Sequence, residues 1–195
     1  MIANTNGPVI LNTQVTNVTC KGAANGSIII TANNGVGTLQ YSVDNGTTFQ
    51  NGNIFNNLSP GIYAAIVKDA NGCKDADSIS IVEPSALTII KIDSVSSTCS
   101  NANGSLTISA NGGTGIIQYS INNGISYQLF NQFNTIISGV YSVIIKDANG
   151  CTATSTIKIN DAPAPVLTNT IANSISCSGA QNGSIQIITK AMCHH

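Results

Sequence analysis

The chain contains few charged residues and no tryptophan. Only 7 basic and 8 acidic side chains occur among its 195 residues, which is 8 % against about 25 % for an average soluble domain. The formal net charge of −1 provides neither a basic field for nucleic acid nor an acidic tail. We therefore predict no nucleic-acid partner.

Long apolar runs are also missing, and histidine is nearly so. The run Ile28–Ile30 is far too short to span a bilayer, so we predict no membrane span in this stretch of chain. The two histidines, His194 and His195, are the last two residues, which leaves Ser-His and Cys-His nucleophile pairs without a base elsewhere. No strand-to-helix glycine-rich phosphate loop is found. These gaps predict a protein that is not an enzyme.

Asparagine and glycine are abundant instead. The sequence holds 25 Asn, and 11 of them directly precede Gly, a dipeptide typical of tight turns. So many turns exclude long helices. Hydrophobic residues nevertheless make up 42 % of the chain and recur with regular spacing, which indicates folded structure rather than disorder. The composition predicts an all-β fold.

An internal repeat organises the chain. Residues 25–73 align without gaps to residues 103–151, with 26 of 49 positions identical and an offset of 78. A third copy begins at Ser176 and stops after about 30 of some 78 residues, the unit length that the offset sets. We therefore predict the following division: a linker from a preceding repeat at 1–14, a β-sandwich repeat at 15–84, a second at 85–163, and a truncated third with an atypical C-terminal end at 164–195.

Each unit reads as six to seven short antiparallel strands. Residues 105–110 alternate in polarity as a half-buried strand does. Asn45-Gly46 tolerates the positive φ angles of a hairpin turn. Turns at intervals of 8 to 12 residues are typical of a sandwich, and we predict tandem Ig-like domains, with Tyr63 and Tyr141 as equivalents of the tyrosine corner.

The six cysteines allow two interpretations. No Cys-x-x-Cys pair is present, so a metal site is not indicated. Disulfides Cys20–Cys73 and Cys99–Cys151, with Cys177 and Cys193 unpaired, compete with buried free thiols. Each bond would contribute about 3 to 4 kcal/mol in the chain-entropy model. Six strands per unit would place both cysteines of a repeat at one end, whereas seven would place them at opposite ends, beyond bonding distance.

Metal sites have only weak candidates. Asp69 and Asp147 stand at equivalent Lys-Asp-Ala-Asn-Gly-Cys turns, where a carboxylate either helps to bind Ca²⁺ or caps its own turn. Capping is the favoured interpretation, and we predict no other cofactor. The end Cys193-His194-His195 resembles a metal-binding cluster, but nothing in the repeat predicts it, and a non-native or truncated end is the favoured explanation.

The motif order within each unit resembles a known repeat. Cys, Asn-Gly-Ser, Gln-Tyr-Ser, Gly-x-Tyr and Lys-Asp-Ala-Asn-Gly-Cys follow one another as in the SprB-type repeat of cell-surface adhesins of gliding bacteria. The resemblance covers both full units and the third copy. It implies a very long secreted protein at the cell surface, with roles in adhesion and gliding motility. It also suggests O-glycosylation of Asp-Ser-aliphatic triplets at Ser78 and Ser94, although chance occurrence of these triplets in Ser-rich strands is the favoured explanation.

Two functions follow from the resemblance and the composition. The first is a non-enzymatic structural or adhesive stalk, whose partners are neighbouring repeats of the same polypeptide and a surface polysaccharide or substratum. The second is a carbohydrate-binding module attached to a secreted hydrolase, which would need exposed aromatic residues. The N-terminal segment lacks a basic start and an apolar stretch, so no signal peptide is indicated, and we expect a fragment of a longer extracellular protein.

Overall fold

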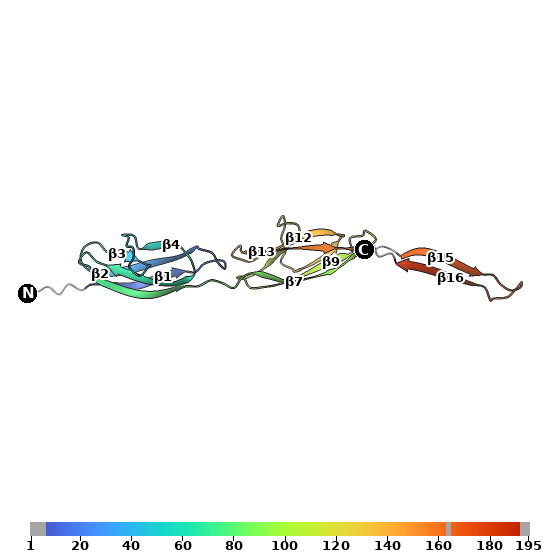
Figure 1. The fold of residues 1–195 in the computed structure, drawn as a ribbon, viewed down its shortest axis with the longest axis horizontal. Helices are drawn as coiled ribbons and strands as arrows, with labels where there is room; N and C mark the ends of the chain where they lie inside the picture. The colour runs from blue at the N-terminus through green and yellow to red at the C-terminus, as the bar shows by residue number, and fades with distance from the viewer. Residues whose placement is uncertain (1–6, 163–164, 192–195) are drawn as a thin grey trace, which may run out of the picture. The chain divides into compact units, whose positions relative to one another are not determined.

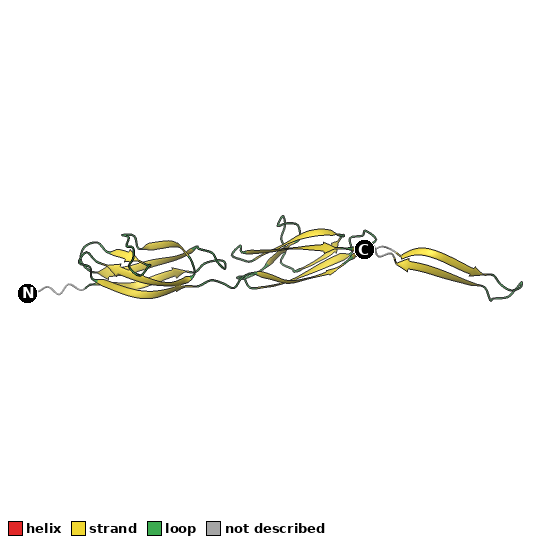
Figure 2. Ribbon diagram, in the orientation of Figure 1, coloured by secondary structure: helices red, strands yellow, loops and turns green. Residues whose placement is uncertain are grey.

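The computed structural model describes residues 7–162 and 165–191, which form β-strands joined by loops, without a helix in these ranges (Figures 1 and 2). This confirms the predicted all-β class. The chain divides into two compact units. The first holds the residues through Thr88 together with two short loops of the second repeat, Gly112–Gly115 and Asp147–Cys151, and the second holds the remainder.

The first repeat is a sandwich of two three-stranded antiparallel sheets, ordered β1-β2-β4 and β3-β5-β6. This is the order A-B-E and C-F-G of an immunoglobulin sandwich, without its D strand. The core is built from both sheets, with β2, β5 and β6 supplying buried Ile and Ala side chains. The strands are β1 Pro8–Thr16, β2 Gly26–Asn34, β3 Gln40–Ser42, β4 Ile54–Leu58, β5 Gly61–Lys68 and β6 Lys74–Ile81.

The second repeat has the same strand order, β7-β9-β11 in one sheet and β10-β12-β13 in the other. A short parallel pair, β8 with β14, lies beside them. Leu106, Ile108, Val143, Ile145 and Ile159 are buried. The strands are β7 Thr88–Val95, β8 Ser97–Thr98, β9 Gly104–Asn111, β10 Gln118–Ser120, β11 Gln132–Ile136, β12 Gly139–Lys146, β13 Thr152–Ile159 and β14 Asp161–Ala162.

The truncated third copy forms a single antiparallel hairpin of β15 (Pro165–Asn173) and β16 (Ser184–Ala191). Its register shifts between Leu167 and Asn169, just as the β1–β2 register of the first repeat shifts between Ile10 and Asn12. The hairpin therefore repeats the opening of a full sandwich, including its irregularity.

The boundary predicted for the first repeat was wrong. Residues 1–14 were expected to be a linker, but β1 begins at Pro8 and pairs with the whole of β2. Ile10 and Val15 pack against the core, and the Ile10 N–H donates to an Asp75 carboxylate oxygen at 2.8 Å. The bulge between Ile10 and Asn12 interrupts the alternation of polarity, which explains why the sequence pattern concealed this strand.

The turns and the tyrosine corners agree with expectation. Asn45 and Gly46 both have positive φ, 59° and 78°, as a type I′ turn requires. The hydroxyl of Tyr63 donates to the Ser59 carbonyl oxygen at 2.8 Å, and that of Tyr141 donates to Ile137 at 2.9 Å. The predicted tyrosine-corner equivalents are therefore confirmed, with each hydrogen bond reaching four residues back along the chain.

The direction of the strands decides where the cysteines lie. β3 is antiparallel to β5, and β4 is antiparallel to β2, so β3 and β4 run the same way. Between them the chain turns back, and Gln50 forms an isolated antiparallel bridge with Tyr41. This extra reversal acts as a very short seventh strand. It places the turn before β2 at one end of the sandwich and the β5–β6 turn at the other.

Candidate functional site

The disulfide in the structure is not one of the predicted pairs. Cys20 is bonded to Cys151, 131 residues away, with 5.7 Å between their Cα atoms. Both residues belong to the first unit. The Nδ2 of Asn149 supports this contact by donating to the Thr19 carbonyl oxygen at 3.1 Å. The expected bonds Cys20–Cys73 and Cys99–Cys151 are therefore replaced by a bond between the two repeats.

The first repeat shows why its own two cysteines do not pair. Near Cys20, the Gly22 N–H donates to Glu83 at 2.8 Å, which follows the end of β6. Near Cys73, the Asp69 carboxylate accepts the Val36 N–H at 3.0 Å, beyond the end of β2. The two cysteines therefore stand at opposite ends of β2, separated by a strand length of about 25 Å, whereas a disulfide requires Cα atoms within about 7 Å.

The other described cysteines are exposed free thiols: Cys73, Cys99 and Cys177. Cys193, together with His194 and His195, lies outside the described residues. Among the residues that are described, no group of three or more His, Cys, Asp or Glu side chains is arranged to hold a metal ion.

Asp69 and Asp147 cap the turns in which they stand. Each is buried. One carboxylate oxygen of Asp69 accepts the N–H groups of Asn71 and Cys73 at 3.0 and 2.9 Å, and Asp147 accepts those of Asn149 and Cys151 at the same distances. Because these neighbours are donors, they compete with a cation for the carboxylate. Hydrogen bonds led by the Val36 N–H lower the pKa of Asp69.

A second carboxylate orders the β3–β4 loop of the first repeat. Both oxygens of Asp44 accept the Thr48 N–H, at 3.0 and 3.1 Å, and the Thr48 and Ser42 hydroxyls also donate to it. The hydrogen bond from the Thr48 hydroxyl has the largest effect and that from the Thr48 N–H the next largest, and they lower the pKa of Asp44 to about 2. The second repeat has Asn122 at this position, whose Oδ1 accepts the Ser126 N–H at 3.0 Å.

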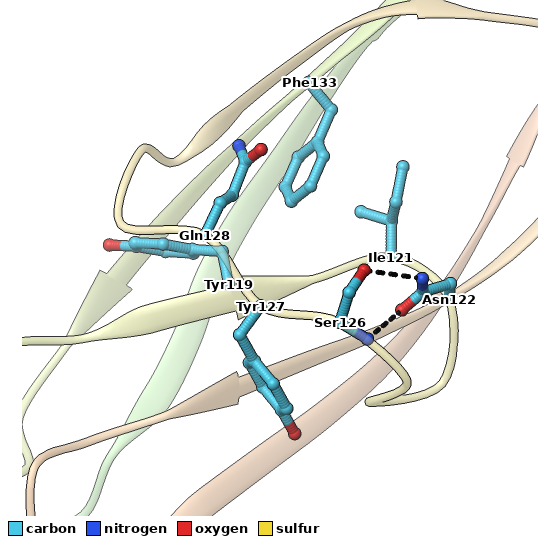
Figure 3. Close-up of a pocket in the computed structure, with 7 residues that line it drawn as sticks. All are labelled: Tyr119, Ile121, Asn122, Ser126, Tyr127, Gln128 and Phe133. Atoms are coloured by element: carbon cyan, nitrogen blue, oxygen red, sulfur yellow. Dashed lines mark hydrogen bonds between the residues drawn. The ribbon is translucent and has the colours of Figure 1, made fainter.

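The equivalent loop of the second repeat carries a pocket of about 270 Å³. Three of its lining residues are aromatic, and three others carry an aliphatic hydroxyl or an amide group. Figure 3 shows Asn122 and Ser126 joined by two hydrogen bonds at one side, and Tyr127 turned away from Phe133. The Lys146 ammonium stands 4.3 Å from the centre of the Tyr127 ring. The lining residues are Tyr119, Ile121, Asn122, Ser126, Tyr127, Gln128 and Phe133.

This loop carries three exposed apolar residues in the second repeat that have no apolar counterpart in the first. Ile125, Leu129 and Phe130 are exposed, at 85 %, 61 % and 79 %. The aligned residues of the first repeat are Thr47, Asn51 and Gly52. Exposed apolar side chains that cluster beside a pocket commonly mark a binding surface. Sequence reasoning overlooked this loop, although the three substitutions were visible in the alignment of the repeats.

The two candidate O-glycosylation sites are accessible. Ser78 on β6 and Ser94 on β7 are both exposed. The Ser78 N–H is held by the Asp77 side chain at 2.7 Å. Accessibility is needed for modification but does not demonstrate it, so glycosylation stays a prediction.

Comparison with known proteins supports the sequence resemblance. The family model described as the SprB repeat matches residues 12–48 and 92–125, one segment in each sandwich. The predicted resemblance to the SprB repeat is thereby confirmed for these two segments. No curated protein is significantly similar to the chain in sequence. The described residues contain no helix that is long and apolar enough to cross a membrane.

Among solved structures, the chain is similar to a 282-residue C-terminal fragment of intimin in complex with the intimin-binding domain of the translocated intimin receptor. Identity is 14 %, the TM-score is 0.41, and 85 % of this chain and 67 % of that chain are covered. Immunoglobulin domains 1–5 of Sidekick-1 share 9 % identity with this chain at a TM-score of 0.40, with 96 % of this chain and 46 % of that chain covered. Domains 4–9 of the surface-layer protein SbsC share 13 % identity with this chain at a TM-score of 0.30, with 94 % of this chain and 35 % of that chain covered. The Ig-like assignment here rests on the sheet order.

The low pKa of Asp44 predicts how the first repeat responds to acid. A carboxylate whose pKa is lower in the folded state stabilises the fold above the unfolded pKa of about 3.9, and this contribution is lost as the pH falls through the folded pKa of about 2. A ¹³C NMR titration of the Asp44 carboxyl carbon should give a midpoint near 2.

The matched control is Asp44→Asn, the residue type that the second repeat already uses. This variant should weaken the decline of melting temperature between pH 4 and about pH 2. A midpoint near the ordinary value of about 3.9, or an unchanged acid profile in Asp44→Asn, would contradict the assigned hydrogen bonds.

Proposed function

We propose that this chain, two segments of which match the SprB repeat, is a non-enzymatic structural and adhesive segment of a large protein exposed at the cell surface. Its neighbouring repeats would be its first partners, and a surface polysaccharide or substratum would be its external ligand. Roles in adhesion and gliding motility belong to this proposal, as does an extracellular location. In this role the sandwiches act as a scaffold that presents loops and do not catalyse a reaction.

The observation that carries the proposal is that the residues shared by the repeats hold the fold together. Ser42 and Ser120 are buried, and each accepts the N–H of the turn glycine four residues on, at 3.0 Å. The Asn53 and Asn131 side chains each donate to a carbonyl oxygen of β2 or β9 at 2.9 Å. The side chains that cap the turns and brace the loops are thus identical in the two repeats, while the core stays apolar even where Ala65 and Val67 are replaced by Val143 and Ile145. Such a pattern is expected of units selected for architecture.

The third copy extends this argument. Asn25, Asn103 and Asn182 each accept a backbone N–H from the residue just before the first cysteine of a repeat, at 3.1, 2.8 and 3.0 Å. The same amides donate back to the Thr or Ser hydroxyl of that residue. One turn is therefore built three times with the same hydrogen bonds, which supports a module used in series.

Surface exposure is tested directly on cells that express the parent protein. Antibodies raised against residues 8–162 should label intact cells, and external protease should remove the label, because the proposal places these repeats outside the cell. A cytoplasmic protein of the same cells serves as the control for membrane integrity. Labelling that appears only after permeabilisation would contradict the proposal.

Carbohydrate binding is the second candidate, and the pocket of the second repeat favours it. Sugars are bound by aromatic faces combined with amide and hydroxyl groups, and Tyr119, Gln128 and Phe133 supply both kinds of surface. The exposed apolar residues of the same loop enlarge this surface. A module that binds glycan here would add adhesion to the structural role.

A glycan array separates these alternatives. The variant Ile125→Thr, Leu129→Asn, Phe130→Gly gives the second repeat the loop residues of the first, and glycan signals should fall at least tenfold. The control is Ile137→Ser, which converts another exposed apolar residue, outside this loop, to its counterpart in the first repeat. Equal binding by both variants, or no glycan bound by the unaltered chain, would reject the carbohydrate role.

A further inference from the structure

The bond between Cys20 and Cys151 joins two different positions of the repeat. Cys20 occupies the first cysteine position, shared with Cys99 and Cys177, and Cys151 occupies the second, shared with Cys73. The bond therefore links the first position of one repeat to the second position of the repeat that follows. Within the described residues, each full repeat keeps one exposed free cysteine of the complementary kind, Cys73 in the first and Cys99 in the second.

The second cysteine position is built identically in the two repeats. Cys73 and Cys151 both donate their N–H to the capping aspartate at 2.9 Å. Both turns are closed by a hydrogen bond from the aspartate N–H to the cysteine carbonyl oxygen at 3.0 Å. The turn that holds Cys73 is therefore built with the same hydrogen bonds as the turn that holds the bonded Cys151.

The first cysteine position is also anchored alike. The turn after Cys20 is held by Glu83, which accepts the Gly22 N–H, and the turn after Cys99 is held by Asp161, which accepts the Ser100 N–H at 3.1 Å. Glu83 and Asp161 are both acidic residues that follow the last strand of a sheet, two residues after Ile81 and Ile159. The Cys99 turn thus reproduces the support of the bonded Cys20 turn, although it is one residue shorter.

We propose that Cys20–Cys151 is one member of a series of disulfides, in which the first cysteine of each repeat is bonded to the second cysteine of the next. Cys99 is then the site for the second cysteine of a following complete repeat, and Cys73 is the site for the first cysteine of a preceding one. The two cysteines of one repeat lie at opposite ends of the sandwich and are too far apart to bond to each other, so each stays available for a cysteine of a neighbouring repeat.

The oxidation is balanced by a small-molecule disulfide such as oxidised glutathione. Two protein thiols lose two protons and two electrons as the S–S bond forms, and the oxidant is reduced to two thiols. Formation of these bonds in the cell requires an oxidising environment, and in this respect alone the inference rests on the proposed function, which places the repeats outside the cell. Experiments with purified protein in a defined glutathione buffer therefore test it separately from location.

The first experiment maps the full chain carrying Cys193→Ser. After oxidation in glutathione buffer, alkylation and digestion, mass spectrometry should find a Cys20–Cys151 linked peptide and alkylated Cys73 and Cys99. Peptides linking Cys20 to Cys73, or Cys99 to Cys151, would overturn the proposal. This result does not depend on any lengthened variant folding.

The second experiment completes the third repeat. Residues 192–195 are replaced by a copy of residues 113–162, in which Thr152→Ser marks the copied cysteine peptide by mass. Alkylation of Cys99 should fall at least tenfold, and Cys99 should be linked to the copied Cys151. The control carries Cys151→Ser in the copy alone and should restore alkylation of Cys99. Full alkylation of Cys99 in the lengthened chain, with Cys20–Cys151 formed, would show that the bond is not repeated.

Discussion

The structure depends on the way each sandwich separates its two cysteine turns. β2 and β5 both run from the end that holds the first cysteine to the end that holds the second, because β3 and β4 run together in the opposite direction. The Gln50–Tyr41 bridge provides the reversal that makes this possible. From this arrangement follow the absence of a bond within the first repeat and the use of Cys151 as the partner of Cys20.

Turn chemistry, rather than ion pairing, secures these sandwiches. Two salt bridges occur in the part of the chain that the structure describes, Lys21–Glu83 and Lys91–Asp93, and exposed pairs of this kind contribute little. The carboxylates of Asp44, Asp69 and Asp161 are instead turned toward N–H and hydroxyl donors, which lower their pKa values. A chain with 8 acidic residues thus uses several of them as caps, which leaves the loops free to vary between copies.

Much of this fold could be predicted from the repeat itself. Aligned apolar positions identified the core, Asn-Gly identified the hairpin turn, and the Tyr63 corner followed from the Ig-like order. The strand at Pro8–Thr16 was concealed by its bulge. The cysteine pairing could not be settled, because strand counting treats every connection as one reversal, whereas the Gln50 segment adds another within a loop. One sign was present: Gln50 and Gln128 are identical, and each amide donates to one carbonyl oxygen in the loop and to one at the start of the next strand.

The candidate site was less predictable than the fold. The pocket near Gln128 depends on how a loop folds over two strands, and no motif marks it. Its only signal was the presence of the apolar residues Ile125, Leu129 and Phe130 where the first repeat has Thr, Asn and Gly. Positions that differ between otherwise similar repeats therefore deserve the same scrutiny as positions that are shared, since architecture explains the latter.

The distance between the two cysteines of one repeat tests the central claim most directly. With the other four cysteines replaced by serine, nitroxide labels on Cys20 and Cys73 can be measured by pulsed electron paramagnetic resonance. The account predicts a distance of about 25 Å, the length of an eight-residue strand. A main population with the labels in contact, as cysteines within about 7 Å of each other would give, would place both turns at one end of the sandwich and contradict the account.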